Sequence, residues 1–152
     1  MNFSSILVPV TGSPLDDHTV KLACEMLKPT EGHLFIVYII QINRALPIDA
    51  VLPSEVLKGD NILKSMEKLV EKFKHVVKAE LIQAREIGYA IVLEATRRKV
   101  DVIAMSISDS KKFGRFELEK AVTYVLKNAE CKVLLWHDQT TKNNDIRVEF
   151  RK

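Results

Sequence analysis

The segment 101–136 constrains the fold of this chain more than any other part of the sequence. An apolar run at 102–105 is followed by a polar stretch at 106–114, by a stretch expected to be helical at about 115–128, and by a second apolar run at 133–136. These features predict a strand, a loop, a helix and a final strand in that order. Such an order is typical of α/β proteins.

Strand and helix signals alternate in the rest of the chain as well. Strands are expected at two apolar runs, at residues 5–10 and 33–40, and at the mixed segment 78–83. The run at 33–40 is almost continuously apolar, as expected for a strand that is covered on both faces. The alternation predicts an α/β sandwich with a mostly parallel sheet.

Three further helices are expected between these strands. The first begins at Asp16 or Asp17, either of which can cap it, and ends before Pro29. The second opens at Asp60, after a looser connection with two prolines, and its apolar residues recur at spacings of three and four. The third follows Gly88. Its basic C-terminal end complements the helix dipole.

Length and composition predict one domain. A chain of 152 residues is expected to bury roughly 70% of its unfolded surface, enough for a single core. There is no internal repeat or linker, so we expect a domain at 1–138 and a C-terminal extension at 139–152. Within the extension, residues 146–150 alternate apolar and polar side chains, which leaves two interpretations: a flexible tail, or a strand added to a sheet edge.

Several classes of protein are not favoured by the composition. Cys24 and Cys131 match no metal-ligand spacing, and two buried thiols suit a reducing cytoplasm. The N-terminus shows no export signal, and the longest apolar run, 34–40, is too short to cross a membrane. The net charge is +3, of which the tail from Lys142 onward carries +2. The nearly neutral remainder gives no reason to expect nucleic-acid binding.

Several motifs together resemble the universal stress protein family. The motifs are the opening 6–10 followed by Gly12 and Ser13, the helix segment 91–95 before 100–103, and the strand–loop–helix–strand segment at 101–136. The resemblance covers about residues 3–136. It implies a doubly wound, five-stranded parallel sheet in the order 3-2-1-4-5 with helices on both faces, the adenine nucleotide α-hydrolase-like fold.

Many members of that family carry a nucleotide-phosphate signature: Gly-x-x-Gly, nine residues, then Gly-Ser or Gly-Thr. Aligned without a gap, the signature places hold Ser106, Asp109, Glu119 and Lys120 in this sequence. Glycines there let backbone N–H groups approach phosphate oxygens. Asp109 and Glu119 are instead expected to bring negative charge near a triphosphate, whereas Lys120 and the other basic residues at 111–115 offer relief.

In a doubly wound sheet the ligand crevice lies where strand order reverses, here between the first and fourth strands. Nucleotide-binding members of the family usually have an acidic residue at the place of Thr11, which can hydrogen-bond but supplies no carboxylate. The resemblance also implies an apolar slot for the base at Pro9, Val10, Ile39 and Met105. Core packing is the alternative role for those four apolar residues. The candidate crevice residues are Pro9, Val10, Thr11, Ile39, Met105, Ser106, Lys120 and Ala121.

Catalytic signatures are absent from the sequence. There is no Walker motif and no Gly-x-Ser-x-Gly elbow. The four histidines, His18, His33, His75 and His137, lie in separate predicted elements and form no ligand pair. The sequence therefore predicts neither an enzyme nor a metal site.

Two functions remain open for this sequence. The first is a cytoplasmic universal stress protein without tight ATP binding and without a cofactor, which acts through protein contacts in the stress response. The alternative is a member that binds ATP or another adenine nucleotide through a remodelled phosphate site. An enzyme of the wider α-hydrolase-like group is a third, less favoured interpretation.

The last predicted strand suggests how the chain assembles. Val133, Leu134, Leu135 and Trp136 form a continuous apolar run on what the family order makes an edge strand. Exposed edges of this kind invite pairing. The resemblance implies a homodimer in which the two last strands meet antiparallel. The alternative is that residues 146–150 fold back over this edge and leave a monomer.

Overall fold

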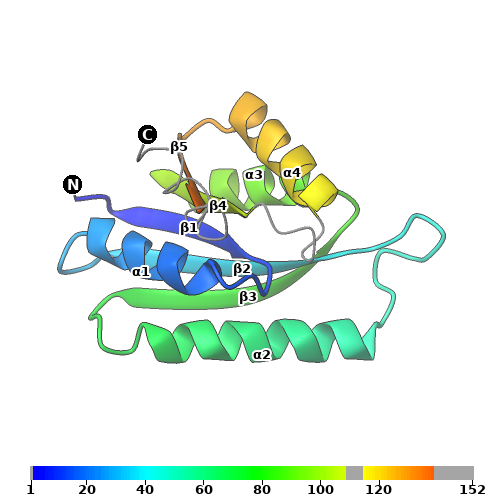
Figure 1. Ribbon diagram of the computed structural model, residues 1–152, viewed down its shortest axis with the longest axis horizontal. Helices are drawn as coiled ribbons and strands as arrows, with labels where there is room; N and C mark the ends of the chain where they lie inside the picture. Colours follow the sequence, from blue (N-terminus) through cyan, green and yellow to red (C-terminus); the bar gives the residue numbers. More distant parts are fainter. Residues whose placement is uncertain (1, 109–114, 139–152) are drawn as a thin grey trace, which may run out of the picture.

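The computed structural model describes residues 2–108 and 115–138 of the chain. It contains one sheet of five strands, with helices on both faces (Figure 1). The elements in chain order are β1 (Ser5–Val10), α1 (Asp16–Met26), β2 (His33–Gln41), α2 (Pro53–Leu69), β3 (Val76–Ala84), α3 (Ile87–Arg98), β4 (Val102–Ser108), α4 (Arg115–Asn128) and β5 (Lys132–Asp138).

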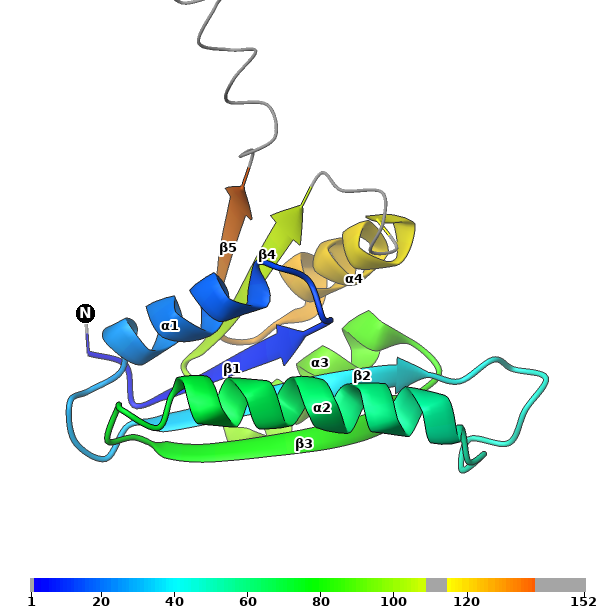
Figure 2. The ribbon, with the colours of Figure 1, turned by 60° about the horizontal axis from the view of Figure 1, so that its bottom comes forward.

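The strand order is β3-β2-β1-β4-β5, and each neighbouring pair is parallel. Helices α1 and α2 cover one face of the sheet, and α3 and α4 cover the other (Figure 2). The fold class and strand order predicted from the sequence are confirmed. The strand order reverses between β1 and β4, as expected, so their carboxyl ends mark the topological switch point.

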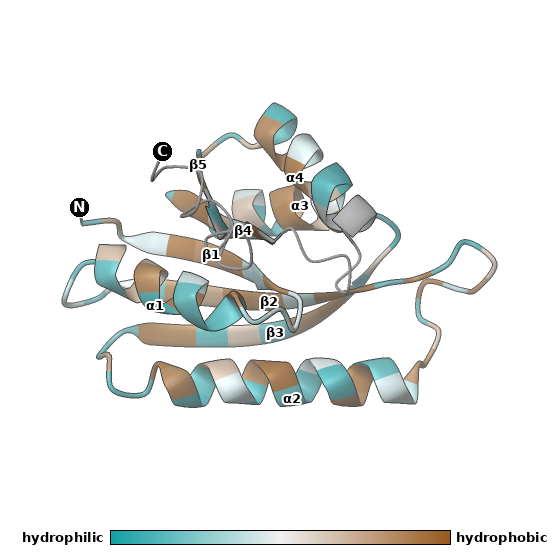
Figure 3. Cartoon of the chain, in the orientation of Figure 1, coloured by the Kyte–Doolittle hydropathy of each residue, from teal (hydrophilic) through white to brown (hydrophobic). Residues whose placement is uncertain are grey.

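Each face of the sheet has its own core because successive residues of a strand point to opposite faces. Ile6, Val8 and Val10 of β1 pack with α1 and α2, whereas Leu7 packs with α3 and α4. Apolar and polar residues alternate along the helices (Figure 3), and the apolar ones supply the helical part of each core. Burial of these apolar residues is the main force that holds the two helical layers on the sheet.

Several element boundaries differ from the sequence prediction. Helix α3 begins at Ile87, so Gly88, which was expected to precede it, lies in its first turn. Helix α2 begins at Pro53, not at Asp60, because proline suits the first helical turn and Val56 already packs against the core. Gly59 lies inside this helix, where α2 passes close to Tyr38. Strand β3 is also longer than predicted, since it starts at Val76.

Some sequence predictions fall on residues that the structure does not describe. Asp109 lies outside the described residues, as does the whole C-terminal extension at 139–152. The predicted division into a domain at 1–138 and an extension therefore stays a prediction. None of the described helices combines the length and the apolar character that are needed to cross a membrane.

Candidate functional site

The loop between β1 and α1 turns sharply and is held by the first residue of α1. Gly12 adopts a φ of 86°, a conformation that favours glycine. The carboxylate of Asp16 accepts the backbone N–H of Thr11 at 3.2 Å and that of Gly12 at 2.7 Å. The sequence predicts that Asp16 or Asp17 caps α1, but Leu15 occupies the N-cap position and no side chain caps the helix. The Asp16 side chain instead accepts hydrogen bonds from the loop before the helix.

Asp16 is an almost completely buried acid, with 4% of its surface exposed. Burial raises the pKa of its carboxyl to about 6, against the opposing effect of the hydrogen bonds from Gly12 and Thr11. The backbone donors that follow β1, which face the switch point, are thus already engaged by a carboxylate of the chain itself. Thr11 itself supplies no carboxylate, and no motif in the sequence indicates that the carboxylate of Asp16, five residues later, turns back to the N–H group of Thr11.

The residues of the predicted apolar slot divide between the two faces of the sheet. Val10 is buried in the core on the α1 and α2 side, whereas Met105 is buried and Ile39 partly buried on the α3 and α4 side. Pro9 and Ser106 are partly buried at the ends of β1 and β4. Thr11 is also partly buried. Val10 and Met105 both contribute to the core.

The other two candidate residues, Lys120 and Ala121, lie on α4 and contact α3. The ammonium of Lys120 lies 3.8 Å from a carboxylate oxygen of Glu86, the residue that precedes α3. Ala121 is buried, and its carbonyl oxygen would lie 3.1 Å from a Cβ placed on Gly88. These contacts associate both residues with the start of α3.

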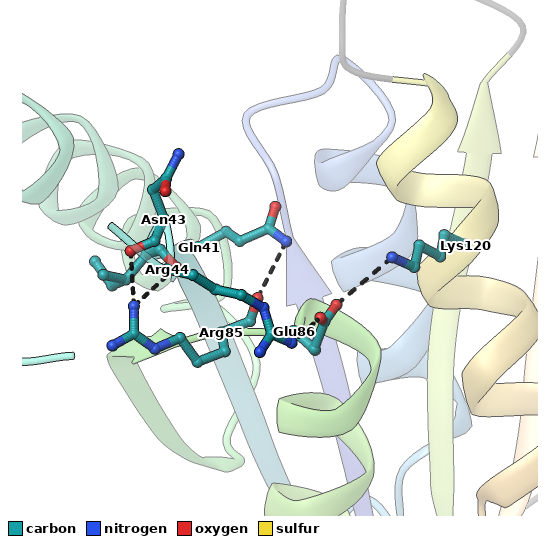
Figure 4. Close-up of polar contacts among 7 residues, drawn as sticks. Gln41, Asn43, Arg44, Arg85, Glu86 and Lys120 are labelled. Atoms are coloured by element: carbon teal, nitrogen blue, oxygen red, sulfur yellow. Dashed lines mark hydrogen bonds and ion pairs between the residues drawn. The ribbon is translucent and has the colours of Figure 1, made fainter. Parts of the chain in front are cut away.

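A polar cluster surrounds Glu86 at the carboxyl ends of β2 and β3 (Figure 4). Glu86 accepts a hydrogen bond from the guanidinium of Arg44 at 3.2 Å and also pairs with Lys120. The Arg44 and Lys120 side chains are 81% and 71% exposed, so both cations stay accessible from solvent. Gln41 donates to the carbonyl of Arg85 at 3.2 Å.

Two side chains at the end of β3 fasten the connection between β2 and α2. Arg85 donates to the carbonyl oxygens of Asn43 at 2.7 Å and Leu46 at 2.8 Å. Gln83 donates to the carbonyl oxygens of Ile48 and Ala50. Arg85 is therefore committed to backbone groups, which leaves Arg44 and Lys120 as the cations of this cluster that a ligand can approach.

A hollow opens between α3 and α4 beside this cluster. It has a volume of about 270 Å³ and is lined by Glu86, Ile87, Gly88, Tyr89, Lys120, Ala121 and Tyr124. A wider polar recess of about 450 Å³ adjoins it and is lined by Gln41, Ile42, Asn43, Arg44, Arg85, Glu86 and Lys120. Glu86 and Lys120 line both, so the apolar hollow continues directly into the polar recess.

The histidines and cysteines occupy separate places. His75 contacts the carbonyl of Cys24 at 3.0 Å, while its Nδ1 is buried without a partner at the opposite, amino end of the sheet. Burial raises the pKa of Cys24 to about 11, so this thiol is a poor nucleophile. Within residues 2–108 and 115–138, no three His, Cys, Asp or Glu side chains are grouped so that they could hold a metal ion.

Strand β5 lies at one edge of the described sheet and pairs with β4. Val133 and Leu134 are partly buried against the two cores, whereas Leu135 is 36% exposed. The indole N–H of Trp136 donates to the hydroxyl oxygen of Thr19 at 2.8 Å, which ties β5 to α1. Thr19 in turn donates to the carbonyl of Leu15 at 2.9 Å, next to Asp16.

A model of the universal stress protein family matches residues 2–137 of the chain. This chain belongs to the universal stress protein family. A universal stress protein of Methanocaldococcus jannaschii is 26% identical over 139 residues, an alignment that covers 88% of this chain and 81% of the relative. The resemblance inferred from the sequence motifs is confirmed.

Solved universal stress protein structures share this fold at low identity. One from Archaeoglobus fulgidus, in complex with dAMP, has a TM-score of 0.69 at 14% identity and covers 89% of this chain and 98% of its own. A universal stress protein in complex with cAMP has a TM-score of 0.67 at 16% identity, with coverages of 90% and 98%. An Arabidopsis thaliana family protein with AMP bound has a TM-score of 0.63 at 12% identity, with coverages of 91% and 94%.

Three of the four places of the altered glycine signature lie among the described residues of this universal stress protein. Ser106 lies in β4, and Glu119 and Lys120 lie in the first half of α4. Sequence reasoning singled out Lys120 but missed its partner Glu86 and the nearby Arg44. The missed residues have no motif of their own, since each is a single polar residue between a strand and a helix.

Proposed function

We propose that this universal stress protein is a cytoplasmic regulatory protein of the stress response that acts through protein contacts and does not bind ATP tightly. The observation that supports this most directly is the buried carboxylate of Asp16 behind the β1–α1 loop. It engages the N–H groups of Thr11 and Gly12, which would otherwise be available to an anionic ligand at the switch point.

Charge repulsion between Asp16 and a phosphate would weaken the binding of ATP. Two unit negative charges about 5 Å apart, at an effective dielectric constant of about 20, repel by about 3 kcal/mol. A phosphate brought that close to ionised Asp16 would therefore lose about two decades of affinity. Lys120 offsets part of this cost, but it already pairs with Glu86 and is too exposed for a strong ionic bond.

Binding of an adenine mononucleotide is the second candidate function. It is favoured by the solved relatives in complex with cAMP, dAMP and AMP. It is also favoured by the two solvent-accessible cations, Arg44 and Lys120, at the carboxyl ends of the strands. A monophosphate needs fewer donors than a triphosphate, so side-chain cations can replace part of a glycine-rich loop.

Isothermal titration calorimetry with ATP, AMP and cAMP distinguishes these candidates. We expect no saturable ATP binding in the micromolar range for the wild type, and a gain for Asp16→Asn, which removes the charge but keeps the shape of the side chain. Tight ATP binding by the wild type would contradict the first proposal. Saturable binding of AMP or cAMP that is weakened by Lys120→Gln would support the second. The proposal includes no enzymatic reaction, so conversion of a bound nucleotide to product would also contradict it.

The protein contacts begin, in this proposal, with a homodimer formed through β5. The supporting observation is that one edge of β5 has no strand partner within the described sheet, although residues 133–136 of this strand form a continuous apolar run. A two-fold axis beside β5 would join two sheets through the same surface of each copy.

A further inference from the structure

We propose that the hollow between α3 and α4 is a binding site for a small planar aromatic molecule that carries an anionic group. The hollow is defined by Ile87, Gly88 and Tyr89 of α3 and by Lys120, Ala121 and Tyr124 of α4, with Glu86 at its polar end. None of these residues belongs to the β1–α1 loop, so this inference does not depend on how tightly ATP binds there, but it shares Lys120 with the proposed mononucleotide site.

Two tyrosines form the aromatic walls of the hollow. Tyr89 is 55% exposed and Tyr124 is 36% exposed, and their rings form an edge-to-face pair with centroids 6.4 Å apart. Exposed aromatic rings that line a recess leave apolar area in water, and a planar ligand removes that area from water while it adds ring-to-ring contact.

The floor of the hollow depends on a close approach of the two helices. A Cβ on Gly88 would lie 2.8 Å from Tyr124 Cβ and 3.1 Å from the carbonyl oxygen of Ala121. Because residue 88 has no side chain, α4 can lie against the start of α3 and close the inner side. A dry cavity of about 150 Å³ holds benzene, so a hollow of about 270 Å³ accommodates a ring system of one or two fused rings.

The net positive charge at the open end of the hollow favours a ligand that carries an anionic group. The polar recess into which the hollow continues is lined by three cationic side chains, Arg44, Arg85 and Lys120, and by a single carboxylate, Glu86. Arg85 is held by backbone carbonyls, and Arg44 and Lys120 share Glu86 between them. A ligand carboxylate or phosphate placed here would meet an excess of positive charge while its rings lie against the exposed faces of the tyrosines.

Calorimetry with indole-3-acetate as the probe tests this proposal. We expect saturable binding by the wild-type protein and at least about fivefold weaker binding of the neutral indole-3-acetamide, which corresponds to about 1 kcal/mol. Lys120→Gln should abolish this preference for the anion. Tyr89→Ala and Tyr124→Ala should each weaken the binding of both probes. Lys127→Gln, a change at the C-terminal end of α4, should behave as wild type.

Circular dichroism and thermal melting of each variant show whether it is folded. Tyr89→Ala is the decisive variant because Tyr89 is the more exposed ring.

A second experiment adds AMP or adenosine as a competitor of indole-3-acetate. Displacement of indole-3-acetate by AMP but not by adenosine would support the site and identify phosphate as an accepted anion. Absence of saturable binding of indole-3-acetate to the wild type would overturn the proposal. Binding that persists unchanged in both tyrosine variants would overturn it as well.

Discussion

Asp16 acts on the β1–α1 loop in two opposite ways. Its carboxylate accepts the N–H groups of Thr11 and Gly12, which stabilises the turn in which Gly12 has a φ of 86°. Its burial, however, disfavours the charged form and raises its pKa to about 6. The same side chain therefore fixes the loop and makes the stability of the protein depend on pH.

The raised pKa of Asp16 predicts the direction in which the free energy of unfolding changes with pH. The ordinary pKa of 3.8 applies to the unfolded chain and the value of about 6 to the native protein, so the native state binds the proton more tightly. Below about pH 4, this tighter proton binding by Asp16 adds on the order of 3 kcal/mol to the free energy of unfolding. That contribution is lost as the pH rises through about 6. Asp16→Asn does not titrate. Its free energy of unfolding relative to the wild type should therefore rise by a similar amount between about pH 4 and about pH 7.

Urea unfolding of both proteins at several pH values measures this difference. Asp17→Asn is the matched control, because Asp17 is the exposed neighbour and its charge makes only a minor contribution to the raised pKa of Asp16. That control should keep most of the wild-type pH dependence. A constant difference between Asp16→Asn and the wild type across the window would show that the pKa of Asp16 is not raised.

Helix α2 lies against the sheet through a glycine. A Cβ on Gly59 would lie 2.6 Å from a ring carbon of Tyr38 and 2.7 Å from a methyl carbon of Leu81. Alanine is better than glycine in a helix by about 1 kcal/mol, but overpacking a core costs about 1–3 kcal/mol. Tyr38 is 6% exposed and has little room to move. We therefore expect Gly59→Ala to destabilise the protein by on the order of 1 kcal/mol.

Thermal or urea unfolding checks this expectation, with Asn61→Ala as the comparison. Asn61 lies on the exposed side of the same helix, so alanine there should leave stability unchanged or raise it by a few tenths of a kcal/mol. If Gly59→Ala proved as stable as Asn61→Ala, the contact between α2 and the sheet would have to be looser than the structure indicates.

The same helix shows where sequence patterns lose precision. The apolar residues of 63–70 recur at helical spacing, and they led to a predicted start at Asp60. The first two turns, from Pro53, are mostly exposed and have few apolar residues, so periodicity carries no signal there. What holds those turns is packing by Val56 and Gly59 against the sheet, a tertiary effect that a local pattern does not encode.

The assembly of the whole molecule can be tested at β5. Leu134 packs against the core, so a charge there would disturb the monomer, whereas Leu135 is 36% exposed and is the cleaner position. In a two-fold dimer, Leu135→Lys would place a like charge from each copy near the shared edge. Light scattering should give twice the chain mass of 17.3 kDa for the wild type and a mass near that of one chain for the variant.

Leu126→Lys is the matched control, since Leu126 is 56% exposed on α4 and not on the sheet edge. It should remain a dimer. A wild-type mass near that of one chain would reject the dimer. A Leu135→Lys protein that stays dimeric would place the interface elsewhere.

The order of the strands and the family could be predicted because they depend on features that extend over the whole sequence. The alternation of apolar runs and helical segments gave the parallel sheet, and the motifs at 6–13 and 91–103 gave the resemblance. The candidate site was less accessible. Positions in strands, such as Met105 and Ser106, could be assigned to the ends of the sheet, but the direction of a side chain such as Asp16 depends on packing.

The contacts around Lys120 show the same limit at longer range. Its partner Glu86 lies before α3, and the two meet only because the sheet brings α3 and α4 side by side. The hollow with Tyr89 and Tyr124 has the same origin. No spacing in the sequence relates these residues, so a pair from separate helices becomes visible only in three dimensions.

The hydrogen bond between Trp136 and Thr19 has an optical consequence. Trp136 is the only tryptophan in the sequence, so the fluorescence of the protein above the tyrosine band comes from one indole held between β5 and α1. Separation of the last strand from α1 would expose this indole to water and move its emission to longer wavelength. The unlabelled protein thus carries a built-in spectroscopic reporter at the junction between its sheet edge and the helix that contains Asp16.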